Sequence, residues 1–315
     1  MSGTAPKGRP VTIGSGPRRA VVGGDALAVL AGPCVVESEA LVLEVARRLV
    51  EWCDARGLPF VFKSSYKKAN RSSVRSFTGP GDREGLAALA RVKRELGVPI
   101  LTDVHAVDEV GPAAEVADVL QVPAFLSRQT ELLVACAQSG RPVKVKKGQF
   151  LAPEDMKQVV EKLESAGAAG VLVTERGATF GYHNLVVDMR SLVILGEFGW
   201  PVVYDVTHSL QMPGGETTGG DRRFALPLAR AAVAVGVDGL FFETHPDPAR
   251  ALSDAATQLP LERIPALLDQ VISVRHALEG VPAGGLAPAR GATGSGAPTI
   301  APASMPGAAP GGVSA

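Results

Sequence analysis

The segment DGLFFETH, residues 238–245, carries the pattern that decides the fold: a continuous apolar run that becomes polar where it ends. Other segments repeat this pattern, at residues 27–34, 59–65, 98–104, 118–123, 142–147, 170–176 and 201–208. Strands that are apolar on both faces are typical of parallel sheets covered by helices. Amphipathic, helix-like segments lie between these runs, for example at residues 38–57, 83–97 and 153–167. The eight strand–helix units therefore predict a closed (β/α)8 TIM barrel of the α/β class.

The chain divides by composition into three parts. Residues 18–280 contain all the strand–helix units and match the length of one such barrel, about 250 residues. Residues 1–17 lack the pattern and are predicted to be a flexible N-terminal segment. Residues 281–315 hold 10 Ala, 8 Gly and 6 Pro, with Arg290 as the only charged residue. A segment with so little apolar bulk cannot bury enough surface to order itself, so we predict a disordered tail.

The charge balance and the cysteines exclude several classes of protein. Lys and Arg total 32 and Asp and Glu total 32, so neither nucleic acid nor an anionic membrane surface is expected as a partner. No stretch of 18 apolar residues is present, so no transmembrane helix is expected, and the first residues have no apolar run of signal-peptide length. Cys34, Cys53 and Cys136 are odd in number and far apart, which favours a reducing compartment, the cytoplasm.

The ends of the predicted strands are unusually polar. In a TIM barrel, the C-terminal ends of the strands surround the active site. Every predicted strand has a polar or thiol side chain at or near this end, which favours one converging site. These residues are Cys34, Lys63, Asp103, His105, Gln121, Lys146, Lys147, Glu175, Arg176, Asp205, His208, Glu243 and His245.

Two segments are locally basic although the net charge is zero. Residues 63–81 contain five Lys or Arg and no acid, and residues 141–147 contain four and no acid. Such clusters suit phosphate and carboxylate groups, although a solvated basic face is an equal alternative for the outer members. Lys63, Lys146 and Arg176 lie within or next to strands, where burial without an anionic partner would be costly. They therefore predict an anion-binding site.

A thiol, an imidazole and two carboxylates suggest a metal site. Cys34, His208 and Glu243 come from the first, seventh and eighth strand ends, which are neighbours once a barrel closes, and Asp254 follows eleven residues after Glu243. This mixed set suits a divalent transition metal rather than calcium. The dispersed spacing leaves open the alternative of a small buried cysteine beside ordinary polar strand ends.

Long motifs follow one another in order through residues 18–280. They are AGPCVVES (31–38), FKSSYKKANRSS (62–73), FTGPG (77–81), LTDVH (101–105), QVPAFLSRQT (121–130), VKKGQF (145–150), ERGATFGYHNLVVDM (175–189), DVTHSLQMPGG (205–215) and ETHPDP (243–248). Together they resemble the 3-deoxy-D-manno-octulosonate 8-phosphate synthase family. That resemblance implies condensation of phosphoenolpyruvate with D-arabinose 5-phosphate, which serves lipopolysaccharide biosynthesis.

The resemblance also implies roles for individual residues. Residues expected to bind phosphoenolpyruvate are Lys63, Lys68, Gln121, Ala124, Lys146 and Arg176. Residues expected to bind arabinose 5-phosphate are Asn70, Arg71, Ser72, Asp103 and Arg128. The expected metal ligands, for Fe, Zn, Mn or Co, are Cys34, His208, Glu243 and Asp254, since relatives with Asn in place of the cysteine work without metal. Residues expected to serve the chemistry itself are Lys68, Lys146, His208 and Asp254.

The resemblance further implies a homotetramer in which Arg128 reaches the sugar phosphate of a neighbouring subunit. The nearest alternative is 3-deoxy-D-arabino-heptulosonate 7-phosphate synthase, which uses erythrose 4-phosphate and carries K-P-R-T after its second strand. Here that place reads KANRSS at residues 68–73, which favours the five-carbon sugar. A non-catalytic sugar-phosphate-binding barrel is disfavoured, because every position that the chemistry needs is present.

Overall fold

The protein folds as a closed parallel barrel. The computed structural model describes residues 8–70, 76–179, 182–213 and 219–279. Within them, β12 pairs in parallel with both β3 and β9, so the barrel sheet has no open edge. The barrel strands are β3 (Ala28–Gly32), β4 (Phe60–Lys63), β5 (Ile100–Asp103), β6 (Val119–Val122), β7 (Val143–Lys146), β8 (Val171–Glu175), β9 (Val202–Asp205) and β12 (Gly239–His245). The predicted (β/α)8 barrel is confirmed.

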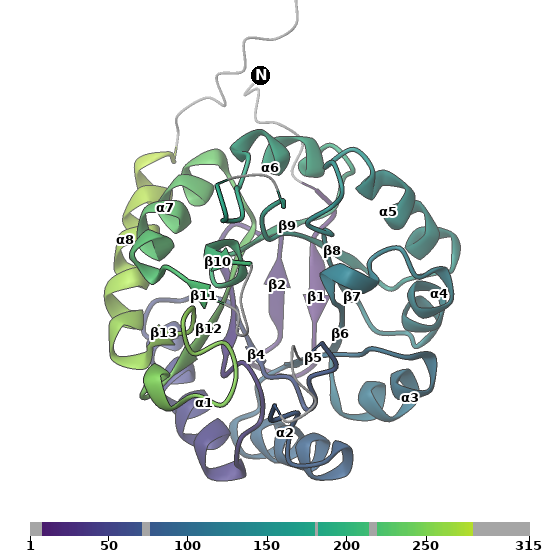
Figure 1. The fold of residues 1–315 in the computed structure, drawn as a ribbon, viewed down its shortest axis with the longest axis vertical. Coiled ribbons are helices and arrows are strands. Elements are labelled where there is room, and N and C mark those ends of the chain that lie inside the picture. Colours follow the sequence, from purple (N-terminus) through teal and green to yellow (C-terminus); the bar gives the residue numbers. More distant parts are fainter. Residues whose placement is uncertain (1–7, 71–75, 180–181, 214–218, 280–315) are drawn as a thin grey trace, which may run out of the picture.

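The helices surround this ring of strands (Figure 1). They are α1 (Glu39–Asp54), α2 (Asp82–Leu96), α3 (Val107–Val116), α4 (Thr130–Gln138), α5 (Met156–Ser165), α6 (Met189–Gly196), α7 (Ala225–Val235) and α8 (Ile264–Ala277). Each buries one apolar face; α1, for example, buries Val42, Val45, Ala46 and Leu49 against the strands. None of the helices in the described part of the chain is long and apolar enough to cross a bilayer.

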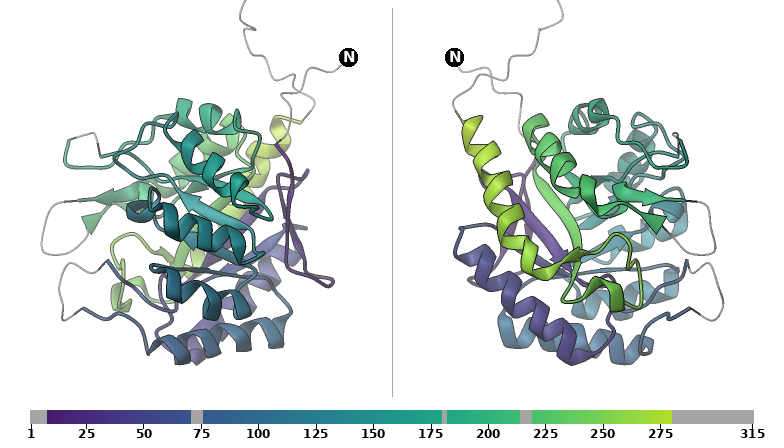
Figure 2. Two further views of the ribbon diagram at one scale, coloured as in Figure 1. Left: turned by 90° about the vertical axis from the view of Figure 1, so that its right-hand side faces the viewer. Right: turned by 60° about the vertical axis from the view of Figure 1, so that its left-hand side comes forward.

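A short antiparallel hairpin precedes the barrel. It pairs β1 (Val11–Ile13) with β2 (Ala20–Val22), and all residues of the two strands except Thr12 and Val21 are buried. Gly170, directly before β8, lies so close that an added Cβ would be 2.8 Å from Val11 Cγ1. The hairpin therefore packs at the N-terminal ends of the strands, opposite the long loops (Figure 2).

This hairpin lies partly within the predicted N-terminal segment. Residues 1–17 are predicted to be a flexible segment, and the structure forms the strand Val11–Ile13 within them. A three-residue strand is too short to give a periodic signal, and it is ordered because Val11 and Ile13 bury their side chains against the barrel. The expected disordered tail, residues 281–315, lies outside the described residues.

Short elements follow several barrel strands at their C-terminal ends. They are the 3-10 turns η1 (Ala124–Leu126), η2 (His208–Leu210), η3 (Arg222–Phe224), η4 (Pro248–Arg250) and η5 (Leu261–Arg263), with β10 (Gln211–Met212), β11 (Gly219–Gly220) and β13 (Leu259–Pro260). The strand β13 pairs in parallel with the last residues of β12. It holds the loop that leads from β12 across the end of the barrel, where the candidate site lies.

Candidate active site at the C-terminal end of the barrel

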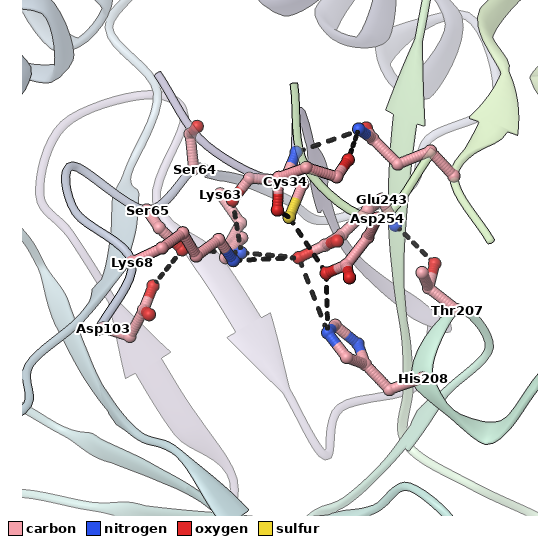
Figure 3. A network of polar contacts seen from close by, with 12 residues as sticks. Cys34, Lys63, Ser64, Ser65, Lys68, Asp103, Thr207, His208, Glu243 and Asp254 are labelled. Atoms are coloured by element: carbon pink, nitrogen blue, oxygen red, sulfur yellow. Dashed lines mark hydrogen bonds and ion pairs between the residues drawn. The ribbon is translucent and has the colours of Figure 1, made fainter. Parts of the chain in front are cut away.

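Three of the predicted metal ligands meet at one point (Figure 3). Possible ligand atoms of Cys34, Glu243 and Asp254 all lie within 4.8 Å of one another. Cys34 follows β3, Glu243 lies on β12, and the register pairs Glu243 with Gly32 across these neighbouring strands. Asp254 comes from the loop after β12 and has a left-handed backbone, φ 48°, with its Oδ2 at 3.2 Å from Cys34 Sγ.

His208 completes the set from η2. Its Nε2 lies 3.9 Å from both Glu243 Oε1 and Asp254 Oδ2. Its other ring nitrogen, Nδ1, lies 3.0 Å from Asp205 Oδ1, and the same oxygen accepts the His208 backbone N–H at 2.9 Å. A carboxylate behind a metal-binding histidine fixes the orientation of the ring. The four predicted ligands are thus brought together, with the imidazole Nε2 facing the cluster.

The electrostatics of this cluster favour a cation. Burial, and then the Asp254 and Glu243 carboxylates, raise the pKa of the Cys34 thiol well above its ordinary value. Glu243 Oε2 is buried and has no hydrogen-bond partner among the described residues. A divalent transition ion would satisfy these oxygens and take the sulfur as thiolate. The donors present therefore fit such an ion.

The buried lysines of the site are paired with carboxylates of the protein itself. Lys63 Nζ donates to Glu243 Oε1 at 2.7 Å, and Lys146 Nζ lies 2.7 Å from Asp205 Oδ2. Lys68 Nζ is 3.9 Å from Glu243 Oε1. Although burial alone would raise it, Lys63 and Lys68 hold the pKa of the Glu243 carboxyl well below its ordinary range. Lys63 and Lys146 were expected to need an external anion, and the carboxylates of Glu243 and Asp205 supply the negative charge instead.

Arg176 differs from these lysines, because part of its guanidinium is free. The side chain is buried next to β8, and its Nη2 donates to Gln211 Oε1. Its Nη1 is buried without a hydrogen-bond partner among the described residues. An unpaired buried donor costs about 1–3 kcal/mol, so this atom is well placed to bind a substrate anion. The same end of the barrel carries Gln121 on β6 and the buried Ala124 of η1.

The predicted sugar-phosphate residues are placed unevenly. Asp103, at the end of β5, is buried and accepts hydrogen bonds from Ser65 Oγ and from the His105 ring Nε2. Asn70 and Arg128 are exposed. Arg71 and Ser72 lie outside the described residues.

Comparison with known proteins identifies the family. The profile of the DAHP synthetase I family matches residues 10–279. The chain is 55% identical over 251 residues to the 2-dehydro-3-deoxyphosphooctonate aldolase of Trichlorobacter lovleyi, which covers 79% of this chain and 92% of that protein. It is 53% identical over 268 residues to the 2-dehydro-3-deoxyphosphooctonate aldolase of Geobacter sp. strain M21. That match covers 84% of this chain and 97% of that protein. It is 56% identical over 262 residues to 2-dehydro-3-deoxyphosphooctonate aldolase 1 of Burkholderia pseudomallei, covering 81% and 92%.

The chain belongs to the 2-dehydro-3-deoxyphosphooctonate aldolase family. This is another name for the 3-deoxy-D-manno-octulosonate 8-phosphate synthases, so the resemblance found in the sequence is confirmed. The wider DAHP synthetase I family also contains the alternative considered above, and the identities above 50% favour the octonate branch.

Two residues of this aldolase barrel were missed as site residues. Asp205 was noted as a strand end, yet its Oδ1 accepts from His208 and its Oδ2 forms an ion pair with Lys146 Nζ at 2.7 Å. Lys144 belongs to the basic segment at residues 141–147, yet it is fully buried, and its Nζ donates to Gln121 Oε1 at 2.9 Å. The alternation in VKVK, with both lysines on one face of a strand, was the signal that would have placed Lys144 inside the barrel.

Replacing Lys144 is expected to stabilise the fold. Burial, and then Lys146, lower the pKa of Lys144 well below its ordinary value. Below about pH 10 the unfolded chain therefore binds a proton that the folded chain binds weakly, so wild-type stability rises with pH. We expect Lys144→Met to raise the free energy of unfolding by about 1–3 kcal/mol at pH 7, with the gain shrinking toward pH 10. Urea unfolding at both pH values measures this, with the exposed Lys157→Met as the control; a loss of stability would contradict it.

Proposed function

We propose that this protein condenses phosphoenolpyruvate with D-arabinose 5-phosphate and water to give 3-deoxy-D-manno-octulosonate 8-phosphate and phosphate. The observation that carries the proposal is identity of 53–56% over most of the chain to proteins named 2-dehydro-3-deoxyphosphooctonate aldolase. The barrel end with its buried cations and its thiol–carboxylate cluster supports it. The protein is accordingly a transferase, 3-deoxy-8-phosphooctulonate synthase.

Phosphoenolpyruvate binds, in this proposal, where the buried cations converge. Its phosphate and carboxylate would contact Lys68, Lys146 and Arg176, and the free Nη1 of Arg176 supplies a donor that no described residue uses. Gln121 and Ala124 line the same end of the barrel, while Lys63 remains paired with Glu243. Fixed cations around both anionic groups orient the enol and stabilise charge during the reaction.

The chemistry forms one carbon–carbon bond and releases phosphate. Carbon 3 of the enol attacks the aldehyde carbon of the sugar, whose oxygen takes up a proton. Water adds to carbon 2, which has become electron-poor, and gives up one proton. The carbon–oxygen bond to the phosphate then breaks, and the new hydroxyl loses its proton to the departing phosphate to leave the keto acid. In this proposal His208, Asp254, Lys68 and Lys146 hold or move the protons. Lys146 Nζ lies 3.2 Å from His208 Nδ1, close enough to pass a proton to it.

A divalent transition metal is part of the proposal. Cys34, His208, Glu243 and Asp254 would hold it, and the donor set suits Fe, Zn, Mn or Co. Such an ion, when bound, polarises a carbonyl oxygen or lowers the pKa of a water.

The test is a comparison of sugar acceptors. The protein is incubated with phosphoenolpyruvate and either arabinose 5-phosphate or erythrose 4-phosphate, and phosphate release is measured. Release that depends on arabinose 5-phosphate supports the proposal. Release that depends on erythrose 4-phosphate would assign the heptulosonate reaction instead, and no release with either sugar would leave a non-catalytic binding protein.

Arg128 provides a test of the proposed homotetramer. The side chain is exposed between η1 and α4, so within one subunit it is a surface residue. In the tetramer it would bind the sugar phosphate of a neighbour, and a charge-assisted hydrogen bond is worth about 1.5–3 kcal/mol. We expect Arg128→Ala to raise the KM for arabinose 5-phosphate by roughly 10- to 100-fold and to leave the KM for phosphoenolpyruvate nearly unchanged. If steady-state assays show equal changes in the KM for arabinose 5-phosphate and the KM for phosphoenolpyruvate, Arg128 does not bind the sugar phosphate.

A cytoplasmic location also belongs to the proposal. All three cysteines are free and buried, and the thiol of Cys34 is needed reduced for metal binding. Such thiols persist where glutathione and thioredoxin keep cysteines reduced.

A further inference from the structure

The Glu109 carboxylate, in the first turn of α3, receives four hydrogen bonds from two different loops. From the loop after β4, Tyr66 Oη donates at 2.8 Å and Lys67 Nζ at 2.9 Å. From the loop after β5, His105 donates its backbone N–H at 2.8 Å and has its ring Nδ1 at 3.1 Å. Although burial alone would raise it, the bonds from Lys67 and Tyr66 lower the pKa of Glu109 to about 2. Glu109 is therefore an ionised group that joins the two loops.

The His105 ring lies between two carboxylates. Its Nδ1 faces Glu109 Oε2 and its Nε2 faces Asp103 Oδ2, each at 3.1 Å. An ionised carboxylate can only accept, so a ring that donates to both carboxylates carries a hydrogen on each nitrogen, as an imidazolium does. Burial alone would lower the pKa of His105, but Asp103 and Glu109 raise it above its ordinary value.

Hydrogen bonds continue from this ring to the metal cluster. The second oxygen of Asp103 accepts from Ser65 Oγ, and Ser65 Oγ in turn accepts from Lys63 Nζ at 3.2 Å. Lys63 donates to Glu243 Oε1 at 2.7 Å (Figure 3). Asp103 therefore has both oxygens held, one by Ser65 and the other by His105.

We propose that Glu109 is a positioning residue for the sugar acceptor: through His105 it holds the Asp103 carboxylate in the orientation that receives the sugar hydroxyls. The inference rests on the proposed function, because it is there that Asp103 contacts arabinose 5-phosphate. Glu109 itself belongs to α3 and stands behind His105, so it acts without contacting the substrate. A purely structural link between the two loops is the competing explanation.

The test compares Glu109→Gln with Asp82→Asn. Both changes remove a carboxylate that binds Lys67, since Lys67 Nζ also contacts Asp82 Oδ2 at 3.1 Å, but only Glu109 reaches His105. We expect Glu109→Gln to raise the KM for arabinose 5-phosphate by roughly 10-fold or more, with less than about a threefold change for phosphoenolpyruvate. Asp82→Asn should leave both constants at their wild-type values.

The pH dependence gives a second readout. The groups around the His105 ring are Asp103 and Glu109, with Lys67 and Tyr66 on the far side of Glu109. Without the Glu109 charge the pKa of His105 falls, and a neutral ring has one N–H for two partners. The KM for arabinose 5-phosphate should therefore begin to rise at a lower pH in Glu109→Gln than in the wild type. Proton NMR of the ring, in wild type and variant, should show the lower His105 pKa directly.

His105→Asn keeps the experiment decisive if Glu109→Gln does not fold. It breaks the link between Glu109 and Asp103 and should raise the same KM by a similar factor. A wild-type KM for arabinose 5-phosphate in either folded variant, or equal rises for both substrates, would overturn the inference. If the wild-type protein shows no phosphate release that depends on arabinose 5-phosphate, the proposed function is overturned instead. The His105 pKa, compared between wild type and Glu109→Gln by NMR, would still test whether the ring is paired with Glu109.

Discussion

Treatment with a strong chelator is expected to abolish phosphate release from phosphoenolpyruvate, and Fe, Zn, Mn or Co is expected to restore it. Magnesium should restore it poorly, because it prefers oxygen ligands in octahedral geometry. Because burial and the Asp254 and Glu243 carboxylates raise the pKa of the Cys34 thiol, binding a metal must displace its proton. Occupancy should therefore fall as the pH is lowered. Metal analysis of the protein, dialysed at several pH values, measures this together with activity.

Two variants of Cys34 separate a ligand from a packed thiol. Cys34→Ser should lose metal and activity. Cys34→Asn should retain a small activity that persists in chelator, because Asn stands at this position in the metal-independent relatives that the sequence resembles. If Cys34 is only part of the core, Cys34→Ser will lower the melting temperature and leave the metal content and chelator response unchanged. Full wild-type activity after verified removal of all metal would refute the metal-dependent mechanism.

Asp205→Asn is expected to cause the largest loss of stability. Asp205 is fully buried, contacts Lys146 at 2.7 Å, and accepts two hydrogen bonds from His208. Removing one partner of a buried ion pair leaves an uncompensated charge, which costs about 3–5 kcal/mol. The His208 ring also loses the acceptor that orients it, and such a loss weakens metal binding about 10- to 100-fold.

The matched control is Asp269→Asn. Asp269 also pairs with a cation, Arg56 at 2.7 Å, but its side chain is 62% exposed. An exposed pair contributes at most about 1 kcal/mol, so this variant should unfold at nearly the wild-type urea concentration and keep its metal. Equal stability of the two variants, or undiminished metal affinity in Asp205→Asn, would contradict the central role given to Asp205.

The sequence by itself determined the barrel and the end of it that carries the site. Continuous apolar runs such as residues 238–245 identify strands buried on both faces, because burial is a local requirement that each segment must meet with its own side chains. The polar ends of those runs placed Cys34, His208 and Glu243 on neighbouring strands as soon as closure was assumed. The short hairpin strand Val11–Ile13 escaped this reasoning, since three residues are too few to establish a period.

Only the tertiary structure decided which charges neutralise one another. Lys63 binds Glu243 across 180 residues of sequence, and Lys146 binds Asp205. These cations were expected to need an anionic substrate as partner, and carboxylates of the protein already pair with them. The sequence also did not predict that Lys144 is buried. Nor did it predict that Tyr66, Lys67 and His105 all bind Glu109. Such contacts form only when the barrel closes and its loops take their final course. They join side chains that are far apart in the sequence at no regular spacing, so no sequence pattern predicts them.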